Sequence, residues 1–411
     1  MSHYRLILED VISGCDTLPA ASFDAVLCDP PYHLTQKSRG GSPQTGGRQT
    51  PFGRARVGTD RGFMGQTWDG GDVAFRPETW TAVARVLKPG AYVLAFGGTR
   101  TWHRLAVALE DAGLEIMDTL MWLYGQGFPK SRDMGRDRAE WEGYGTALKP
   151  AWEPILLARK SSPGSYAKNL TTWGCGALNV DGARIPLTGR GDALHGGNGR
   201  LLSHNRDARP DPGISHNGYA GSPLGRFPAN LLLDEESAAA LDAQTGVLKS
   251  GAMAAGTPRT AGNRFVYGDM DGQATKSDIH ANQGGASRFF YTGKVKTRER
   301  QAGLPEGLVN DHATLKPIAL AEYLSTLLLP PPGGAPRRLL VPFSGAGSEM
   351  IGALRAGWET VVGVERMTEY GTIARYRLRH WVPAACEEGG EDALDGASRT
   401  APAAAVDGSF G

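Results

Sequence analysis

The segment Asp29-Pro30-Pro31-Tyr32 carries the most specific chemistry in this chain. It follows a short apolar run, residues 25–28, which predicts a buried strand. Two successive prolines fix φ and donate no backbone hydrogen bond, so this strand should end in a stiff loop. The Asp29 carboxylate and the Pro30 carbonyl can accept both hydrogens of an exocyclic amino group, and a tyrosine ring can stack on the base that carries it. This chemistry suits alkylation of the amino nitrogen of adenine or cytosine.

The same segment has a purely structural interpretation. Asp-Pro-Pro is also an ordinary turn at the end of a strand, and Tyr32 can be a packing residue. The segment alone leaves both interpretations open.

A second segment, near the other end of the chain, has the pattern of a cofactor site. A strand at 338–341 is followed by Gly345-x-Gly347, a helix at 349–356, and a strand at 360–364 that ends at Glu365. Glycines let the backbone approach a ligand closely, and the terminal acid can accept hydrogen bonds from ribose hydroxyls. The pattern predicts an adenosine-containing cofactor. The third glycine of the dinucleotide fingerprint is missing, which argues against NAD, and a tight strand–helix turn is the structural alternative.

Strands alternate with helices along both ends of the chain. Apolar runs predict strands at 4–8, 91–96 and 116–123, and helical spacing predicts helices at 77–87, 101–111 and 315–329. This alternation predicts an α/β fold with a mostly parallel, doubly wound sheet. Since ligands of such sheets bind at the carboxyl ends of the strands, the two segments can share one site.

The middle of the chain lacks this regularity. Residues 161–290 are dense in Gly, Asn, Arg and Ser, which predicts an inserted, loop-rich region that recognises a large partner, with a disordered insertion as the alternative. We therefore expect a catalytic half at 1–160, a target-recognition region at 161–290, a cofactor-binding half at 291–385 and a disordered acidic tail at 386–411. A mobile loop at 36–71 is expected to close over the site.

Composition narrows the class of protein. The chain has 411 residues, 40% hydrophobic and 21% charged, and a net charge of +1. No apolar run approaches the roughly 18 residues of a membrane span, and the four cysteines lack metal-like spacing, so we expect a cytoplasmic globular protein without a metal. Basic residues gather at 37–61 and 184–209, which suits a polyanion or merely solvated loops. No Pro-Cys pair is present, which excludes the usual nucleophile for attack at cytosine carbon 5.

The motifs of this chain, in their order along the sequence, resemble those of the beta-class amino-directed DNA methyltransferases, in a phage- and prophage-like branch. The matching segments are Asp29–Tyr32, Phe63-Met64-Gly65, Trp68-Asp69, Arg85–Gly90, Gly127–Ser131, Arg226–Asn230, His312–Pro317 and Phe343–Ser348. The resemblance covers most of the chain and implies a Rossmann-like methyltransferase sheet with an inserted target-recognition region.

The resemblance also implies an activity. It implies methyl transfer from S-adenosylmethionine to N6 of adenine in double-stranded DNA after base flipping, with N4 of cytosine, or an inactive DNA-binding relative, as alternatives. The implied catalytic residues are Asp29, Pro30, Pro31 and Tyr32. The implied cofactor residues are Asp10, His312, Thr314, Lys316, Phe343, Ser344, Gly345, Gly347, Ser348 and Glu365. Double-stranded DNA is the expected partner, and a homodimer and a cognate restriction endonuclease stay open.

One position departs from the family pattern. The family has Asp-Pro-Phe where this chain has Val341-Pro342-Phe343. The resemblance implies that the missing carboxylate lies near the amino group of the cofactor. We expect Glu349, in the first turn of the next helix, to replace it.

Overall fold

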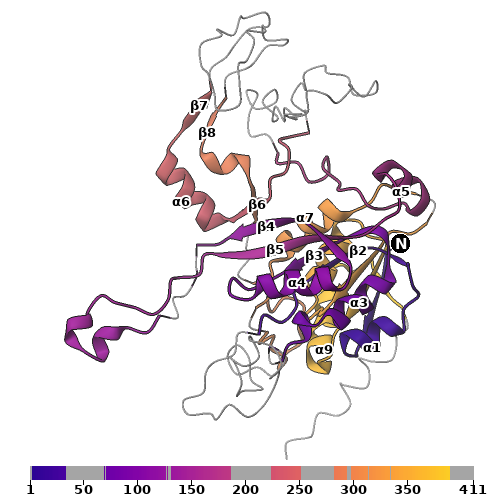
Figure 1. Ribbon diagram of the computed structural model, residues 1–411, viewed down its shortest axis with the longest axis horizontal. Coiled ribbons are helices and arrows are strands. Elements are labelled where there is room, and N and C mark those ends of the chain that lie inside the picture. The colour runs from indigo at the N-terminus through magenta and orange to yellow at the C-terminus, as the bar shows by residue number, and fades with distance from the viewer. Residues whose placement is uncertain are drawn as a thin grey trace, which may run out of the picture. The chain divides into compact units, whose positions relative to one another are not determined.

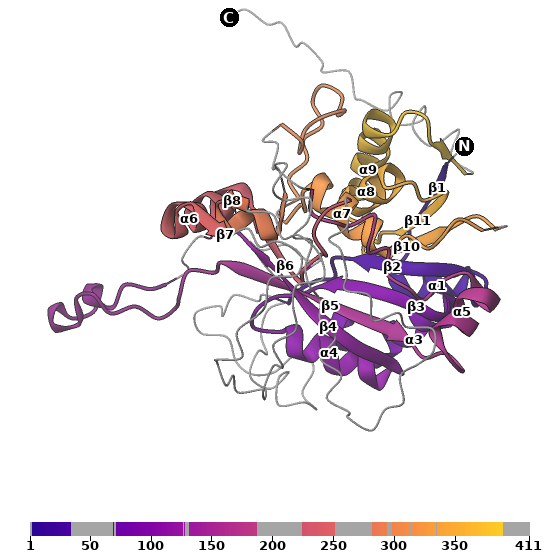
Figure 2. The same cartoon turned by 90° about the horizontal axis from the view of Figure 1, so that it is seen from above.

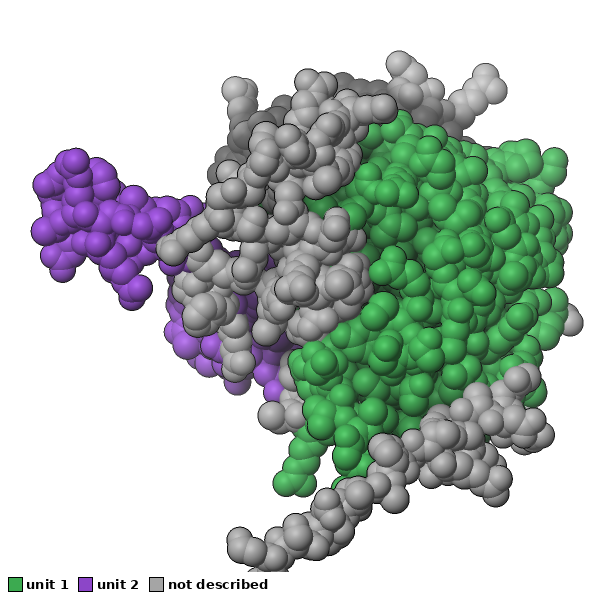
Figure 3. Space-filling model, turned by 90° about the horizontal axis from the view of Figure 1, so that it is seen from below, with its two compact units in different colours: residues 1–118, 155–178, 296–411 green, residues 119–154, 179–295 purple. Residues whose placement is uncertain are grey.

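The computed structural model describes residues 2–33, 69, 71–125, 127, 131–186, 224–250, 282–293, 298–312, 314–333 and 335–388. The chain divides into two compact units (Figure 3). Unit 1 comprises residues 1–118, 155–178 and 296–411, and unit 2 comprises residues 119–154 and 179–295. Each unit is described by itself.

Unit 1 contains a mostly parallel sheet with the strand order β12-β1-β11-β10-β2-β3-β5. Its strands are β1 (His3–Ile7), β2 (Phe23–Cys28), β3 (Leu87–Phe96), β5 (Trp152–Lys160), β10 (Arg338–Pro342), β11 (Thr360–Val364) and β12 (Cys386–Glu387). All of these pairs are parallel except β3 with β5, which is antiparallel. Every residue of β2 is buried, as expected for a strand that is covered on both faces.

Helices cover both faces of this sheet, which confirms the predicted doubly wound α/β fold (Figures 1 and 2). They are α1 (Val11–Asp16), α3 (Pro77–Val86) and α4 (Trp102–Asp111) on one face, and α7 (Ile318–Leu328), α8 (Ser348–Arg355) and α9 (Thr368–Trp381) on the other.

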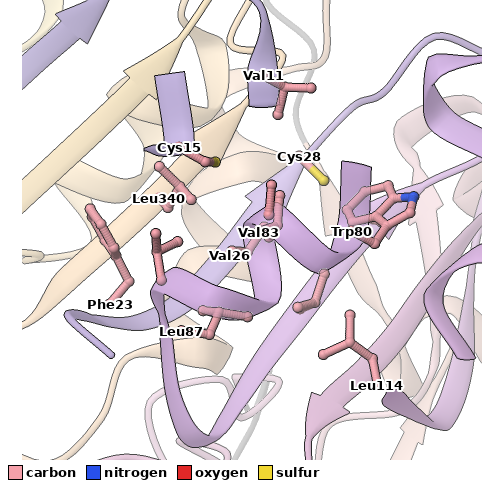
Figure 4. Packing of buried hydrophobic residues seen from close by; sticks show 14 of the residues in the cluster. Val11, Cys15, Phe23, Val26, Cys28, Trp80, Val83, Leu87, Leu114 and Leu340 are labelled. Atoms are coloured by element: carbon pink, nitrogen blue, oxygen red, sulfur yellow. The ribbon is translucent and has the colours of Figure 1, made fainter. Parts of the chain in front are cut away.

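The core under α1, α3 and α4 is built from aliphatic side chains around one large aromatic residue (Figure 4). Val26, Leu340 and Val83 meet there, and Trp80 is fully buried beside them. The indole nitrogen of Trp80 donates to the Ala74 carbonyl at 2.9 Å, so its polar atom is satisfied. This packing fixes the central strands, and with them the loops that follow.

The predicted elements of unit 1 lie where the sequence indicated, within a few residues at their ends. The helix predicted at 315–329 begins only at Ile318, after Pro317. Sequence patterns missed α1, α9 and α5 (Tyr166–Trp173), and α5 lies inside the region predicted to be loop-rich. Ser165 caps α5, and Gly174 ends it with φ +73°.

Unit 2 has its own short parallel pairings. Its elements are β4 (Leu114–Leu123), which begins before the unit boundary, β6 (Leu231–Asp234), α6 (Glu235–Thr245), β7 (Leu248–Ser250), β8 (Asn282–Gly284) and β9 (Tyr291–Gly293). Strand β6 pairs parallel with β4 and β9, and β7 pairs antiparallel with β8. Short 3-10 turns occur at Val73–Phe75 in unit 1 and at Met134–Arg136, Ala139–Trp141 and Ala286–Phe289 in unit 2.

The compact units do not follow the predicted domain ranges residue by residue. Residues 119–154 were expected in the catalytic half and fall in unit 2, whereas 161–178 fall in unit 1. Cys386 and Glu387, expected in the tail, pair with β1. Nearly all of the predicted loop at 36–71 and of the tail lies outside the described residues. Within the described part of the chain, no helix has the length and apolar content needed to cross a membrane.

Candidate active site

Four adjacent parallel strands of unit 1 end at the same edge of the sheet, and the candidate residues follow their ends. The strands are β1, β11, β10 and β2, in that order. Asp10 follows β1 and Glu365 follows β11, while Phe343 and Asp29 come directly after β10 and β2. The parallel register therefore gathers residues from distant parts of the sequence, as the carboxyl-edge rule predicts.

One cavity of about 130 Å³ lies at this edge. Its lining includes Asp29, Pro30 and Tyr32 from the first predicted segment, together with Gly345 and Glu365 from the second. The structure thus brings the two segments into one space. The lining also contains the predicted residues Asp10, Pro31, His312, Thr314, Lys316, Phe343 and Ser344, but not Gly347 or Ser348.

Asp29 forms a buried ion pair inside this cavity. The ammonium of Lys316 lies 2.6 Å from Asp29 Oδ2, and the two side chains are 3% and 12% exposed. The other carboxylate oxygen, Oδ1, is enclosed and has no hydrogen-bond partner among the described residues. Asp29 therefore has one oxygen committed within the protein and one oxygen able to accept from a ligand.

Side chains from distant segments hold the rest of this loop. Thr101 Oγ1 donates to the Tyr32 carbonyl at 3.0 Å, and the His33 amide donates to Asp69 Oδ1 at 2.8 Å. His33 has φ +51°, which is a strained value for a residue with a Cβ. A Cβ added at Gly98 would lie 3.2 Å from the Cβ of Tyr32, so the backbone passes close to the ring.

The turn after β10 makes one backbone hydrogen bond to the adjacent strand β11 and one within itself. The Ser344 amide donates to the Val364 carbonyl at 3.0 Å, and the Gly347 amide donates to the Ser344 carbonyl at 2.8 Å. Phe343 and Gly345 have φ +59° and +49°, values that favour glycine. The Ser344 hydroxyl is buried and has no hydrogen-bond partner among the described residues.

Glu365, at the end of the neighbouring strand β11, stabilises this turn by hydrogen bonds. Its Oε2 accepts from the Gly345 amide at 2.8 Å and its Oε1 accepts from the Met367 amide at 2.7 Å. Burial raises the pKa of this carboxyl. Each carboxylate oxygen can accept a second hydrogen bond, so Glu365 can still bind ribose hydroxyls.

His312 forms a wall of the same turn. A Cβ at Gly345 would lie 3.0 Å from His312 Nε2, and the rings of His312 and Tyr370 meet edge to face at 4.7 Å. Burial lowers the pKa of His312 to about 4, so the ring is neutral at physiological pH. A side chain at position 345 would therefore fill the space beside His312.

Asp10 caps helix α1. Its carboxylate accepts from the Ile12 and Ser13 amides at 3.0 and 3.2 Å, and from the Ser13 hydroxyl. The Ser13 side-chain hydrogen bond lowers the pKa of Asp10, which keeps a negative charge at the rim of the cavity.

Glu349 lines the cavity, whereas Val341 is fully buried in β10. Glu349 is only 5% exposed. Burial raises its pKa to about 7, and the nearby negative charge of Asp29 adds to this shift. The cavity therefore does contain a carboxyl from the first turn of α8, although strand β10 lacks one.

Sequence reasoning missed Arg377, a buried support of the turn at 343–347. Its guanidinium donates to the Ala346 carbonyl and to Ser348 Oγ, and burial lowers its pKa to about 10. The predicted cofactor residue Ser348 thus contacts Arg377. The available signal was a cation on the apolar face of a helix, beside Ile373 and Ala374.

Some predicted segments cannot be placed. Phe63-Met64-Gly65, Trp68 and residues 128–130 lie outside the described residues, whereas Asp69 contacts His33 as stated above. The described residues contain no group of three or more His, Cys, Asp or Glu side chains that could hold a metal ion.

These features fit an adenosine-containing cofactor with a polar tail. Gly345 has no side chain, so a ligand can approach its backbone closely. Glu365 offers hydrogen-bond acceptors, and a ligand can supply the hydrogen bond that the buried Ser344 hydroxyl lacks among the described residues.

Comparisons with known proteins found DNA methylases. The family model of the N6/N4 DNA methylases matches residues 23–375. The type II methyltransferase M.HindIII of Haemophilus influenzae is 28% identical over 202 residues, which are 41% of this chain and 63% of that protein. The chain thus spans less than two thirds of the length of this curated relative.

The solved structures that match this chain are distant in sequence and have low TM-scores. M1.HpyAVI is 12% identical with a TM-score of 0.39, covering 91% of this chain and 98% of its own. The putative DNA modification methylase TTHA0409 of Thermus thermophilus, complexed with S-adenosylmethionine, is 14% identical with a TM-score of 0.41, covering 94% and 98%. The cytosine-N4-specific PvuII DNA methyltransferase is 10% identical with a TM-score of 0.45, covering 94% and 95%.

Because the family model covers most of the sequence, this chain belongs to the N6/N4 DNA methylase family, whose methyl donor is S-adenosylmethionine.

Proposed function

We propose that this protein transfers the methyl group of S-adenosylmethionine to the N6 amino group of adenine in double-stranded DNA. One observation carries the proposal: the Asp29–Tyr32 loop and the glycine turn at Gly345 line the same cavity. A methyl donor bound at the turn would then lie within reach of an amino group held at the loop.

The chemistry requires orientation more than proton transfer. The amino nitrogen of adenine is a poor nucleophile, because its lone pair is delocalised into the ring. Asp29 Oδ1 and the Pro30 carbonyl can hold its two hydrogens, so that the lone pair points away from them. S-adenosylmethionine, when bound, supplies an activated methyl group on a sulfonium. The negative charge of Asp29 also stabilises the positive charge that grows on nitrogen during transfer.

The target base must first leave the duplex. Flipping costs a few kcal/mol, and stacking on an aromatic ring returns about 1–3 kcal/mol. Tyr32 lines the cavity and its backbone is fixed by Thr101, so its ring can serve as the stacking surface.

Unit 2 offers features that support target recognition. The guanidinium of Arg184 lies 5.9 Å from the ring centroid of Phe227, and that of Arg288 lies 4.2 Å from the ring of Phe289. Both rings are exposed, at 59% and 39%. Exposed aromatic rings interleaved with arginines are typical of surfaces that bind nucleic acid, which favours DNA contact in the predicted region 161–290.

The test is a transfer assay with tritium-labelled S-adenosylmethionine and duplex DNA, followed by digestion to nucleosides and mass spectrometry. We expect N6-methyladenine. N4-methylcytosine would overturn the choice of adenine, which rests on the Asp in the first position of the motif. Absence of any transfer would favour an inactive DNA-binding relative, to which the departure at Val341 points. A cytoplasmic location, a homodimer and a cognate endonuclease stay predictions.

A further inference from the structure

We propose that Lys316 is a positioning residue for Asp29 and not a ligand of the cofactor. The inference deepens the proposed function and rests on it for the role of Asp29. It differs from the expectation given above, in which Lys316 was a cofactor residue.

The contacts of Lys316 point toward Asp29 and aromatic rings. Its ammonium lies 2.6 Å from Asp29 Oδ2, and 5.2 and 4.9 Å from the ring centroids of Tyr32 and Phe96. The side chain is only 3% exposed. A carboxylate and two aromatic rings therefore lie close to the cation, and both kinds of group stabilise an ammonium.

This ion pair is expected to persist through the reaction. Separating the two groups would leave an uncompensated charge inside the protein, which is strongly unfavourable. Lys316 is thus not a temporary occupant that gives way to the amino group of the base.

Because this contact persists, the two carboxylate oxygens of Asp29 have different roles. Oδ2 is held by Lys316, and Oδ1 is enclosed without a hydrogen-bond partner among the described residues. The base amino group needs two acceptors, and Oδ1 together with the Pro30 carbonyl provides them. Lys316 therefore fixes the rotation of the carboxylate that presents Oδ1.

The direct test replaces Lys316 by Met, which keeps the length of the side chain and removes the charge. We expect kcat for DNA methylation to fall roughly 100-fold, as for other misplaced catalytic groups, while the Kd for S-adenosylmethionine changes less than twofold. Lys316→Arg keeps the charge and should recover part of kcat. An unchanged kcat in Lys316→Met would overturn the proposal, as would a tenfold weaker cofactor affinity.

The chain offers a matched control. Lys88 pairs with Asp24 at 2.5 Å, with side chains 17% and 3% exposed, and neither residue lines the cavity. Lys88→Met breaks a similar ion pair, so its melting temperature should fall while kcat per folded molecule stays near that of the wild type. A fall in kcat equal to that of Lys316→Met would show a general loss of structure and overturn the specific role.

A second comparison works even if Lys316→Met does not fold or the proposed methylation fails. Asp29→Asn with Lys316→Met removes both charges and leaves no lone ion inside the protein. Calorimetry should give this double variant the same affinity for S-adenosylmethionine as Asp29→Asn alone. A further tenfold loss on removing Lys316 would identify it as a cofactor ligand and overturn the inference, whether or not DNA is methylated.

Discussion

The two loops that line the cavity are held in place by different means. The turn at 343–347 is fixed by one hydrogen bond within its own backbone, by the Val364 carbonyl and Glu365 at the end of the adjacent strand, and by Arg377. The loop at 29–33 is fixed by side chains from distant segments, namely Lys316, Thr101 and Asp69. The hydrogen-bond partners of the proposed cofactor turn lie within 31 positions of it along the chain, whereas those of the proposed catalytic loop lie 36 to 287 positions away, so the loop depends more strongly on the completed fold.

Removing Asp29 should have the largest effect. Asp29→Ala deletes the acceptor Oδ1 and leaves the ammonium of Lys316 without its carboxylate. We expect methyl transfer to fall below detection in the tritium assay, while fluorescence anisotropy still shows DNA binding.

Asp24→Ala is the control for this variant, because Asp24 is also buried and ion-paired but does not line the cavity. It should lower the melting temperature and keep transfer per folded molecule. Robust transfer by Asp29→Ala would refute the assigned role of the loop.

Glu349 sharpens the comparison, because it follows the cofactor turn and also responds to the charge of Asp29. Its pKa is raised from an ordinary 4.5 to about 7 in the folded protein. The stability that it contributes is therefore fully present below pH 4.5 and is lost as the pH rises through about 7. The Glu349→Gln variant has no carboxyl to titrate at this position. As the pH rises from 4.5 through about 7, the free energy of unfolding of this variant should therefore increase relative to that of the wild type by on the order of 3 kcal/mol.

Thermal melts of both proteins at pH 5 and pH 8.5 measure this effect, and a difference that does not change with pH would contradict it. We also expect Glu349 to contribute to cofactor binding, because it would replace the carboxylate that the family has at position 341. Glu349→Ala should bind S-adenosylmethionine more weakly in calorimetry, and an unchanged affinity would remove Glu349 from the cofactor site.

Tyr32 tests whether the catalytic loop supplies a stacking surface. Tyr32→Ala removes the ring and should lower kcat/KM for DNA by about 1–3 kcal/mol, or roughly 5- to 150-fold. Tyr32→Phe and Tyr32→Trp keep an aromatic ring and should lose much less. Steady-state kinetics on one duplex compares the three variants, and equal losses would count against stacking.

The smallest expected effect is on the cofactor turn. Gly345→Ala places a Cβ 3.0 Å from His312 Nε2 at a residue with φ +49°. The added Cβ would press on His312, which lines the cavity, so we expect roughly tenfold weaker cofactor binding by calorimetry, in addition to a stability cost of about 1–2 kcal/mol for a left-handed residue with a Cβ.

Gly357→Ala is the matched control for Gly345→Ala. Gly357 has φ +96°, and a Cβ there would meet nothing within 4 Å. The backbone strain should lower its melting temperature and leave cofactor affinity unchanged. Equal affinity in the two variants would show that the close approach at Gly345 has no role in binding.

The comparison also explains what the sequence could predict. Asp29 and Gly345 each stand at the end of an apolar run next to Pro or Gly, and these local signals located both loops. The parallel-strand rule then predicted their common edge. The partner of Lys316 could not be predicted, because a side-chain contact between residues 287 positions apart leaves no periodic pattern.

Short or atypical elements were missed for similar reasons. Helix α1 has six residues, and its clearest signal is the cap at Asp10, which the sequence interpretation assigned to the cofactor. Arg377 was missed although it stands on an apolar helix face, because the acceptors that explain its burial, such as the Ala346 carbonyl, leave no pattern in the sequence.

The separation between Asp29 and Lys316 has a consequence for how the protein is made. Asp29 leaves the ribosome long before Lys316 is translated, and β2, although it also pairs with β3, must wait for β10 to gain its second parallel partner. Contacts between such distant residues form late and slowly. A nascent chain that stops short of residue 316 therefore carries the Asp-Pro-Pro-Tyr sequence without the ammonium that we propose orients its carboxylate.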